Sequence, residues 1–180
     1  MDKDIKDIKD LKVLIDENSL SKRIKELADE INSSYPENET LTLICILRGA
    51  VMFYAELAKH LKMPVKMEFV SLSSYCNSQK SSGKVKSLNI DLPDFENQNV
   101  LIIEDIIDTG LTLDFLMNFI SHHCKAKSVK LAVLFDKKCA RKFDIKPDFS
   151  AYEIDDKFIV GFGLDYCGLD RNLNYVGYFE

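Results

Sequence analysis

The chain has 180 residues, which is the size of a single domain, and 46% of them are hydrophobic, enough for a substantial core. Its 24 basic and 29 acidic residues leave a net charge of −5, which argues against a protein that binds nucleic acid through a basic face. The five cysteines are scattered without a Cys-x-x-Cys pair, so we expect neither a disulfide framework nor a zinc site.

In chain order, the first nine residues alternate charged residues with isoleucine and lack the apolar core of a signal peptide. No later run reaches the ~20 apolar residues that a membrane span needs. We therefore expect a cytoplasmic protein without a membrane partner. The first predicted element is an amphipathic helix that has Ser19 or Ser21 as its N-cap and an apolar face made by Leu20, Ile24, Leu27 and Ile31.

The next segments alternate between strand and helix patterns. Leu41–Leu47 is a continuous apolar run, typical of a strand buried on both faces, and Ala50–Leu61 is predicted to be a helix. Ser73–Ser87 is rich in serine and lysine and predicts a mobile loop. A later helix would bury Leu113, Leu116, Met117 and Ile120. The other predicted strands are Val65–Leu72, Val100–Ile103, Val129–Phe135, Phe149–Ile154 and Phe158–Gly163.

This alternation predicts one α/β domain with a central, mostly parallel sheet flanked by helices. Ligands of such sheets bind beyond the carboxyl ends of the strands. Three polar strings follow predicted strands, namely LRG at 47–49, EDIIDTG at 104–110 and DKK at 136–138. Their meeting at one edge predicts a binding site there.

The string Asp108-Thr109-Gly110-Leu111-Thr112 leads directly into a predicted helix. Small and hydroxyl residues at a helix start leave backbone N–H groups free, and the helix dipole adds positive potential, which suits a phosphate monoester. The alternative is that Asp108 and Thr109 only cap the helix.

Glu104 and Asp105 stand just before this loop, so three carboxylates lie within five residues without a cation among them. A buried, unpaired charge is costly. The carboxylates either face water or meet a cation such as magnesium or the hydroxyls of a sugar. Arg48-Gly49 also allows two interpretations, because this pair suits either a simple turn or an anion-binding site.

Four segments carry a more specific resemblance. VLIIEDIIDTGLT at 100–112 resembles the phosphoribosyl-pyrophosphate motif of type I phosphoribosyltransferases, and LRGA at 47–50 resembles the pyrophosphate loop of that family. Ser73-Ser74-Tyr75 resembles the start of its flexible catalytic loop. The chain from 146 onward, including DKFIVGFGLDY and RNL, resembles the purine-specific tail of the hypoxanthine-guanine members.

The resemblance implies the type I phosphoribosyltransferase fold in a single domain, 1–180. Its core would be about 41–145, its small hood would come from about 1–40 and 146–180, and its mobile catalytic loop would be about 73–87. It also implies a homodimer or homotetramer.

The implied reaction joins hypoxanthine, guanine or both to 5-phosphoribosyl 1-pyrophosphate, with Mg²⁺, and yields IMP or GMP and pyrophosphate. The alternatives are a phosphoribosyltransferase for xanthine, or a regulatory protein of the same fold that senses phosphoribosyl pyrophosphate.

The resemblance also implies roles for single residues on the phosphoribosyl side. The 5′-phosphate would lie on Asp108, Thr109, Gly110, Leu111 and Thr112, and Glu104 and Asp105 would hold the ribose hydroxyls directly or through magnesium. Pyrophosphate would contact Arg48 and Gly49, with a cis peptide between them, and also Arg171. Asp165 would bind a second magnesium ion.

On the base side, Asp108 would be the general acid or base at purine N7, and Lys137 would donate to the 6-oxo group. Phe158 would stack on the base, and the backbone of Ile159 would read its edge. Ser74 and Tyr75 would reach over the site and help to exclude water. The alternatives are a surface position for Lys137, a core position for Phe158 and a merely disordered loop at 73–87.

Overall fold

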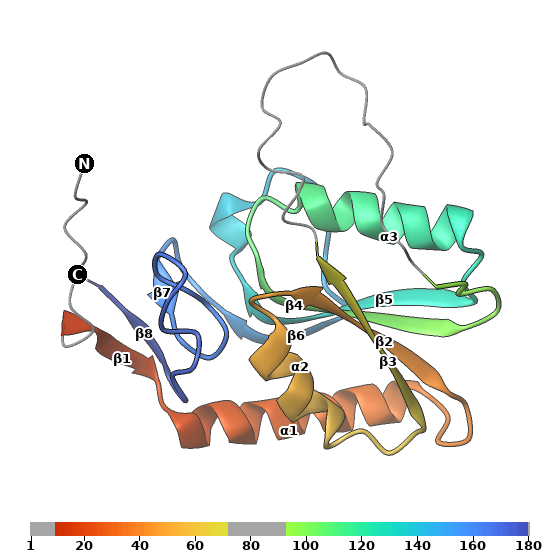
Figure 1. The fold of residues 1–180 in the computed structure, drawn as a ribbon, viewed down its shortest axis with the longest axis horizontal. Helices are drawn as coiled ribbons and strands as arrows, with labels where there is room; N and C mark the ends of the chain where they lie inside the picture. The colour runs from red at the N-terminus through yellow and green to blue at the C-terminus, as the bar shows by residue number, and fades with distance from the viewer. Residues whose placement is uncertain (1–9, 72–92, 180) are drawn as a thin grey trace, which may run out of the picture.

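The computed structural model describes residues 10–71 and 93–179, which form two sheets of unequal size (Figure 1). The larger sheet has five parallel strands in the order β3-β2-β4-β5-β6. Its strands are β2 (Leu41–Leu47), β3 (Val65–Ser71), β4 (Asn99–Ile107), β5 (Ser128–Asp136) and β6 (Phe149–Glu153). The helices are α1 (Glu17–Ser34), α2 (Val51–Ala58), α3 (Leu111–His123) and the short 3-10 helix η2 (Lys138–Ala140).

Helices cover both faces of this sheet, with α1 and α2 on one side and α3 on the other (Figure 1). Leu43 and Cys45 of β2 belong to the hydrophobic cluster that includes α1 and α2. Ile44 and Ile46 of the same strand belong to the cluster that includes α3. Both faces of β2 are therefore buried, which explains its uninterrupted apolar sequence. The predicted α/β fold with a parallel central sheet is confirmed.

The opening helix buries the predicted apolar face, since Leu20, Ile24, Leu27 and Ile31 are all fully buried. The prediction of a serine N-cap was wrong. Asp16 caps the helix, because its carboxylate accepts the Ser19 N–H at 3.0 Å and the Ser19 hydroxyl at 2.8 Å. Ser19 thus serves as the donor.

The third predicted strand is longer than its apolar run. β4 continues through Ile107, and Glu104 pairs with Val133 of β5 in the ladder. The expectation that Glu104 and Asp105 follow the strand was therefore wrong. Backbone pairing with β5 extends the strand across charged residues that an apolar pattern does not include.

The smaller sheet joins the two ends of the described chain. It contains β1 (Lys12–Ile15), β8 (Val176–Tyr178) and β7 (Ile159–Val160), all antiparallel. β1 and β8 were not predicted, and β7 is shorter than the predicted strand Phe158–Gly163. β6 pairs with β5 in the larger sheet, although it lies in the segment assigned to the hood. The boundaries of core and hood stay a prediction.

Within 10–71 and 93–179, no helix has the length and apolar character to cross a membrane.

Candidate active site

Because the larger sheet is parallel, the segments after β2, β4 and β5 lie at the same edge. Arg48-Gly49 follows β2, Asp108 follows β4 and Lys137 follows β5. The three predicted strings are therefore brought to one edge.

The loop after β2 touches β4 directly. A Cβ added to Gly49 would overlap Asp105 Oδ2 and lie 2.5 Å from its Cγ. Glycine at this position lets the backbone of the loop reach the Asp105 carboxylate. The cis peptide bond joins Leu47 to Arg48, one residue before the predicted place. Neither peptide precedes a proline, so the sequence holds no local signal that distinguishes them.

Glu104 and Asp105 carry the carboxylates of β4. Asp105 is buried, and its Oδ1 accepts the Ile106 N–H at 2.8 Å. Burial of the Glu104 carboxyl is the main cause that raises its pKa well above the usual range, and the hydrogen bond to Asp105 is the second cause. Among the described residues, no lysine or arginine forms an ion pair with either carboxylate. A bound cation or the hydroxyl groups of a ligand could therefore still be their partner.

The loop after β4 leads into α3 through Gly110, which is the N-cap at φ +86° and makes no side-chain cap hydrogen bond. Asp108 and Thr109 are therefore not the N-cap of α3, and the alternative that gave them this role was wrong. Asp108 is exposed. The Thr109 carbonyl accepts hydrogen bonds from the N–H groups of Lys142 and Phe143 at 3.0 and 3.2 Å, and these bonds tie the loop to the segment after η2. The backbone is thus arranged as an anion site requires.

Lys137 does not point freely into solvent. Its side chain is 14% exposed, and its Nζ lies 2.5 Å from Oδ1 of Asp156, whose side chain is 80% exposed. The hydrogen bond to Asp156, and then the charges of Asp156 and Asp108, raise the pKa of Lys137 above its usual range. Lys137 is therefore a charged donor at neutral pH, and the surface alternative is wrong for it.

Phe158 lies two residues after Asp156, the partner of Lys137, and is 61% exposed. Its ring meets Tyr166 edge-on, with centroids 6.0 Å apart. The core alternative for Phe158 is therefore wrong, and its ring is accessible to a planar ligand. Ile159 is buried in β7, opposite Tyr178 of β8.

The segment after β7 returns to the loop after β2. A Cβ on Gly163, at φ +104°, would overlap the carbonyl oxygen of Gly49. Arg171 donates to the Gly163 carbonyl at 2.7 Å and pairs with Asp165 at 2.5 Å. The Asp165 carboxylate also accepts the Gly168 N–H at 2.7 Å. Asp165 and Arg171 are thus joined to each other near Gly49.

Sequence reasoning missed Asp156 and Gly163. Asp156 has no signal of its own, because its role depends on a contact with a lysine on another strand end. The spacing Gly161-Phe162-Gly163 was a usable signal for close backbone approach. Ser74, Tyr75 and the predicted loop 73–87 lie outside the described residues, and the side chain of Thr112 is likewise not described.

The donor set fits a hard cation such as magnesium. Within the described residues, no group of three or more His, Cys, Asp or Glu side chains could hold a metal ion by itself. Magnesium commonly takes one or two carboxylates and completes its coordination with water and substrate phosphate. Glu104 and Asp105 meet that requirement, whereas Asp165 would have to exchange its bond to Arg171.

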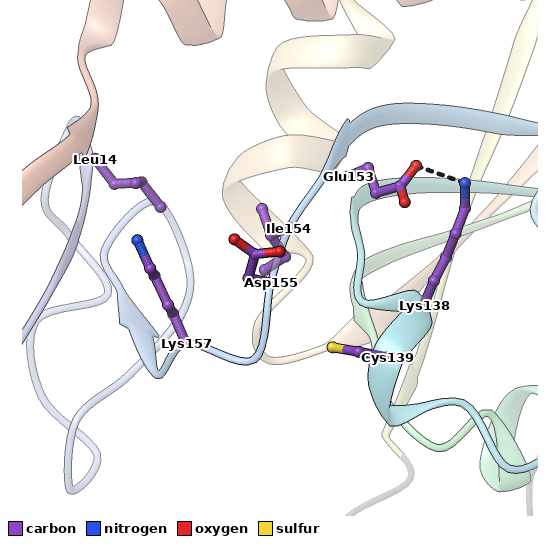
Figure 2. A pocket seen from close by; sticks show the side chains of 7 residues that line it. All are labelled: Leu14, Lys138, Cys139, Glu153, Ile154, Asp155 and Lys157. Carbon is purple, nitrogen blue, oxygen red and sulfur yellow. Dashed lines mark hydrogen bonds and ion pairs between the residues drawn. The ribbon is translucent and has the colours of Figure 1, made fainter.

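A cavity of about 250 Å³ lies next to this site but shares none of its predicted residues (Figure 2). The Lys138–Glu153 ion pair forms one side, and Lys157 and Leu14 lie across from it. The other lining residues are Cys139, Ile154 and Asp155.

Comparison with known proteins agrees with this arrangement. Residues 10–167 match the model of the phosphoribosyl transferase domain, and the chain belongs to that family. The predicted family is confirmed.

Particular relatives share nearly the whole chain. It is 46% identical to the hypoxanthine-guanine phosphoribosyltransferase of Bacillus subtilis (strain 168) over 166 residues, which are 92% of this chain and 91% of the relative. A solved hypoxanthine-guanine phosphoribosyltransferase from Bacillus anthracis matches with a TM-score of 0.83 at 39% identity, covering 98% of this chain and all of that one. A Staphylococcus aureus hypoxanthine phosphoribosyltransferase matches with a TM-score of 0.85 at 35% identity, over 96% and 93% of the two chains.

Proposed function

We propose that the protein transfers the phosphoribosyl group of 5-phosphoribosyl 1-pyrophosphate to hypoxanthine or guanine, forming IMP or GMP and pyrophosphate. The observation that carries this proposal is the meeting of a helix start with a glycine N-cap, a carboxylate pair and a charged lysine at one sheet edge. The relatives named above, which share 35–46% of their residues with this chain, bear the same enzyme name.

The base site would select 6-oxopurines. Lys137 is held protonated by Asp156 and can only donate, so it favours the oxo group over the amino group of adenine. The exposed Phe158 ring offers a face for stacking, and the Ile159 backbone would read the edge of the base.

The phosphoribosyl site would lie on the other strand ends. The backbone from Asp108 to Thr112 would hold the 5′-phosphate at the N-terminus of α3. Glu104 and Asp105 would accept hydrogen bonds from the ribose hydroxyls. Arg48-Gly49 and Arg171 would contact the pyrophosphate.

Magnesium would be held by Glu104 and Asp105, and a second ion by Asp165. The bound ion would supply positive charge against the phosphate and pyrophosphate oxygens. A cation there would favour the charged form of Glu104, whose pKa is raised by burial.

In the reaction, the bond from ribose C1′ to the pyrophosphate oxygen breaks and the bond from C1′ to purine N9 forms. Asp108 is the exposed first residue of this phosphate loop, residues 108–112, and would hold or move the proton at N7. Arg48 and Arg171 would offset charge that develops on the departing pyrophosphate.

We also propose a homodimer or homotetramer. Four apolar side chains on α2 and the edge strand β3 are exposed, and Phe69 packs on Tyr54 with ring centroids 5.3 Å apart. Exposed apolar area of this kind marks association surfaces. The exposed residues are Val51, Met52, Met67 and Phe69. Light scattering on the purified protein tests this directly, and a monomer would contradict it.

The test of the reaction is a panel of four bases. Pyrophosphate release is measured with hypoxanthine, guanine, xanthine or adenine, each with phosphoribosyl pyrophosphate and magnesium. We expect release with hypoxanthine and guanine and little with adenine. Binding of phosphoribosyl pyrophosphate without turnover on any base would instead favour the sensing function, and turnover on xanthine alone would favour the xanthine enzyme.

A further inference from the structure

A buried ion pair at the end of β5 is not used by the proposed mechanism. The guanidinium of Arg141, just after η2, bonds to the carboxylate of Asp136, the last residue of β5. The two side chains are 15% and 6% exposed. The same guanidinium donates to the carbonyl oxygen of Ile145. Arg141 therefore joins the two ends of a turn that runs from 136 to 145.

One side of this turn supports the phosphate loop. The N–H groups of Lys142 and Phe143 donate to the carbonyl oxygen of Thr109. A Cβ added to Gly110 would lie 2.6 Å from Cγ2 of Ile145, so the turn and the loop are in close contact. Any shift of the turn must therefore move the phosphate loop or open a gap behind it.

The other side of the turn fixes the base-binding lysine. Lys137 follows Asp136 directly, and its N–H donates to the carbonyl oxygen of Ile107 at 3.1 Å. Ile107 in turn immediately precedes Asp108. Lys137 and the phosphate loop are thus attached to one turn, and Arg141 bridges the two ends of that turn with its two side-chain bonds.

We propose that Arg141 is a positioning residue that fixes the separation between Lys137 and the 5′-phosphate loop. A nucleotide spans that distance, so it binds well only if both ends are satisfied together. This inference rests on the proposed function, since it assigns a nucleotide to the site. Arginine suits the role because its planar fork reaches two acceptors, which a lysine cannot do in the same geometry.

The test compares two ligands on Arg141→Lys. IMP would contact the phosphate loop, the ribose carboxylates and the base site, whereas ribose 5-phosphate would contact the first two but not the base site. Dissociation constants are measured by calorimetry on the intact protein with magnesium. We expect the value for ribose 5-phosphate to change by less than about 3-fold and the value for IMP to rise about 10-fold or more, because misplacement by ~1 Å costs up to ~10²-fold.

Two further variants separate positioning from folding. Lys138→Met removes the exposed Lys138–Glu153 pair on the cavity wall (Figure 2) and should leave both constants unchanged. Asp136→Asn with Arg141→Met removes both buried charges together, so no charge is left unpaired in the core. It should fold and show the same selective loss of IMP binding.

Equal losses for IMP and ribose 5-phosphate, or a change below 3-fold for both, would overturn the inference. In the Lys137→Ala background, Arg141→Lys should cost much less IMP affinity, because the base end is already lost. An undiminished cost there would also overturn it. Wild-type protein that binds neither ligand would overturn the proposed function and this inference with it.

Discussion

Gly49→Ala should inactivate the enzyme by displacing a carboxylate. The new Cβ would overlap Oδ2 of Asp105, its nearest atom, and a contact of this kind settles near ~3.5 Å, so the carboxylate or the loop must move by about 2 Å. The Asp105 bond to the Ile106 N–H at 2.8 Å would be disturbed. Misplacement of that size costs on the order of 10²-fold in kcat/KM, and overpacking costs roughly 1–3 kcal/mol of stability.

The assay is steady-state pyrophosphate release with varied phosphoribosyl pyrophosphate, alongside thermal unfolding. Gly168→Ala is a matched control, because its φ of +86° strains alanine while nothing lies within 4 Å of the new Cβ. The control should lose about 1 kcal/mol of stability and keep its activity. Full activity in Gly49→Ala would refute the contact between the loop and β4.

Three further predictions concern single side chains. Lys137→Ala should raise KM for hypoxanthine at least about 10-fold and leave KM for phosphoribosyl pyrophosphate nearly unchanged, because a charged hydrogen bond to the base is lost; equal changes in both KM values would contradict the assigned role. Asp108→Asn should lower kcat by about 10²-fold while sparing IMP binding, as expected for an acid or base, and an unchanged kcat would remove it from that role. Since the folded pKa of Glu104 is raised, its contribution to stability is full below the ordinary value of 4.5 and declines as pH rises toward the folded value. Glu104→Gln should abolish that decline in magnesium-free unfolding as pH rises above the ordinary value of 4.5, and an unaltered pH dependence would contradict the pKa shift.

The strands of the core could be predicted because burial on both faces leaves an unbroken apolar run. Leu41–Leu47 was predicted with its observed bounds for this reason. The end of β4 could not be predicted in the same way, because pairing with β5 carries the strand through Glu104 and Asp105 to Ile107. Charged residues interrupt the apolar pattern of a buried strand, so a sequence pattern assigns them to a loop.

Contacts between distant segments were out of reach of local patterns. The pairing of Lys12 with Tyr178 in the smaller sheet joins residues that are far apart in the chain, and the two strands, of four and three residues, are too short to be recognised alone. The Lys137–Asp156 pair was missed for the same reason. The candidate site residues were predicted from their positions at strand ends and from family resemblance, and their roles stay predictions.

The most direct test of the proposed function is identification of the product. Purified protein is incubated with hypoxanthine, phosphoribosyl pyrophosphate and magnesium, and nucleotides are separated by chromatography with mass detection. We expect IMP and pyrophosphate in equal amounts, with Lys137→Ala forming far less IMP at the same hypoxanthine concentration. Absence of IMP, or release of pyrophosphate with free ribose 5-phosphate in its place, would contradict the proposed transfer to the purine.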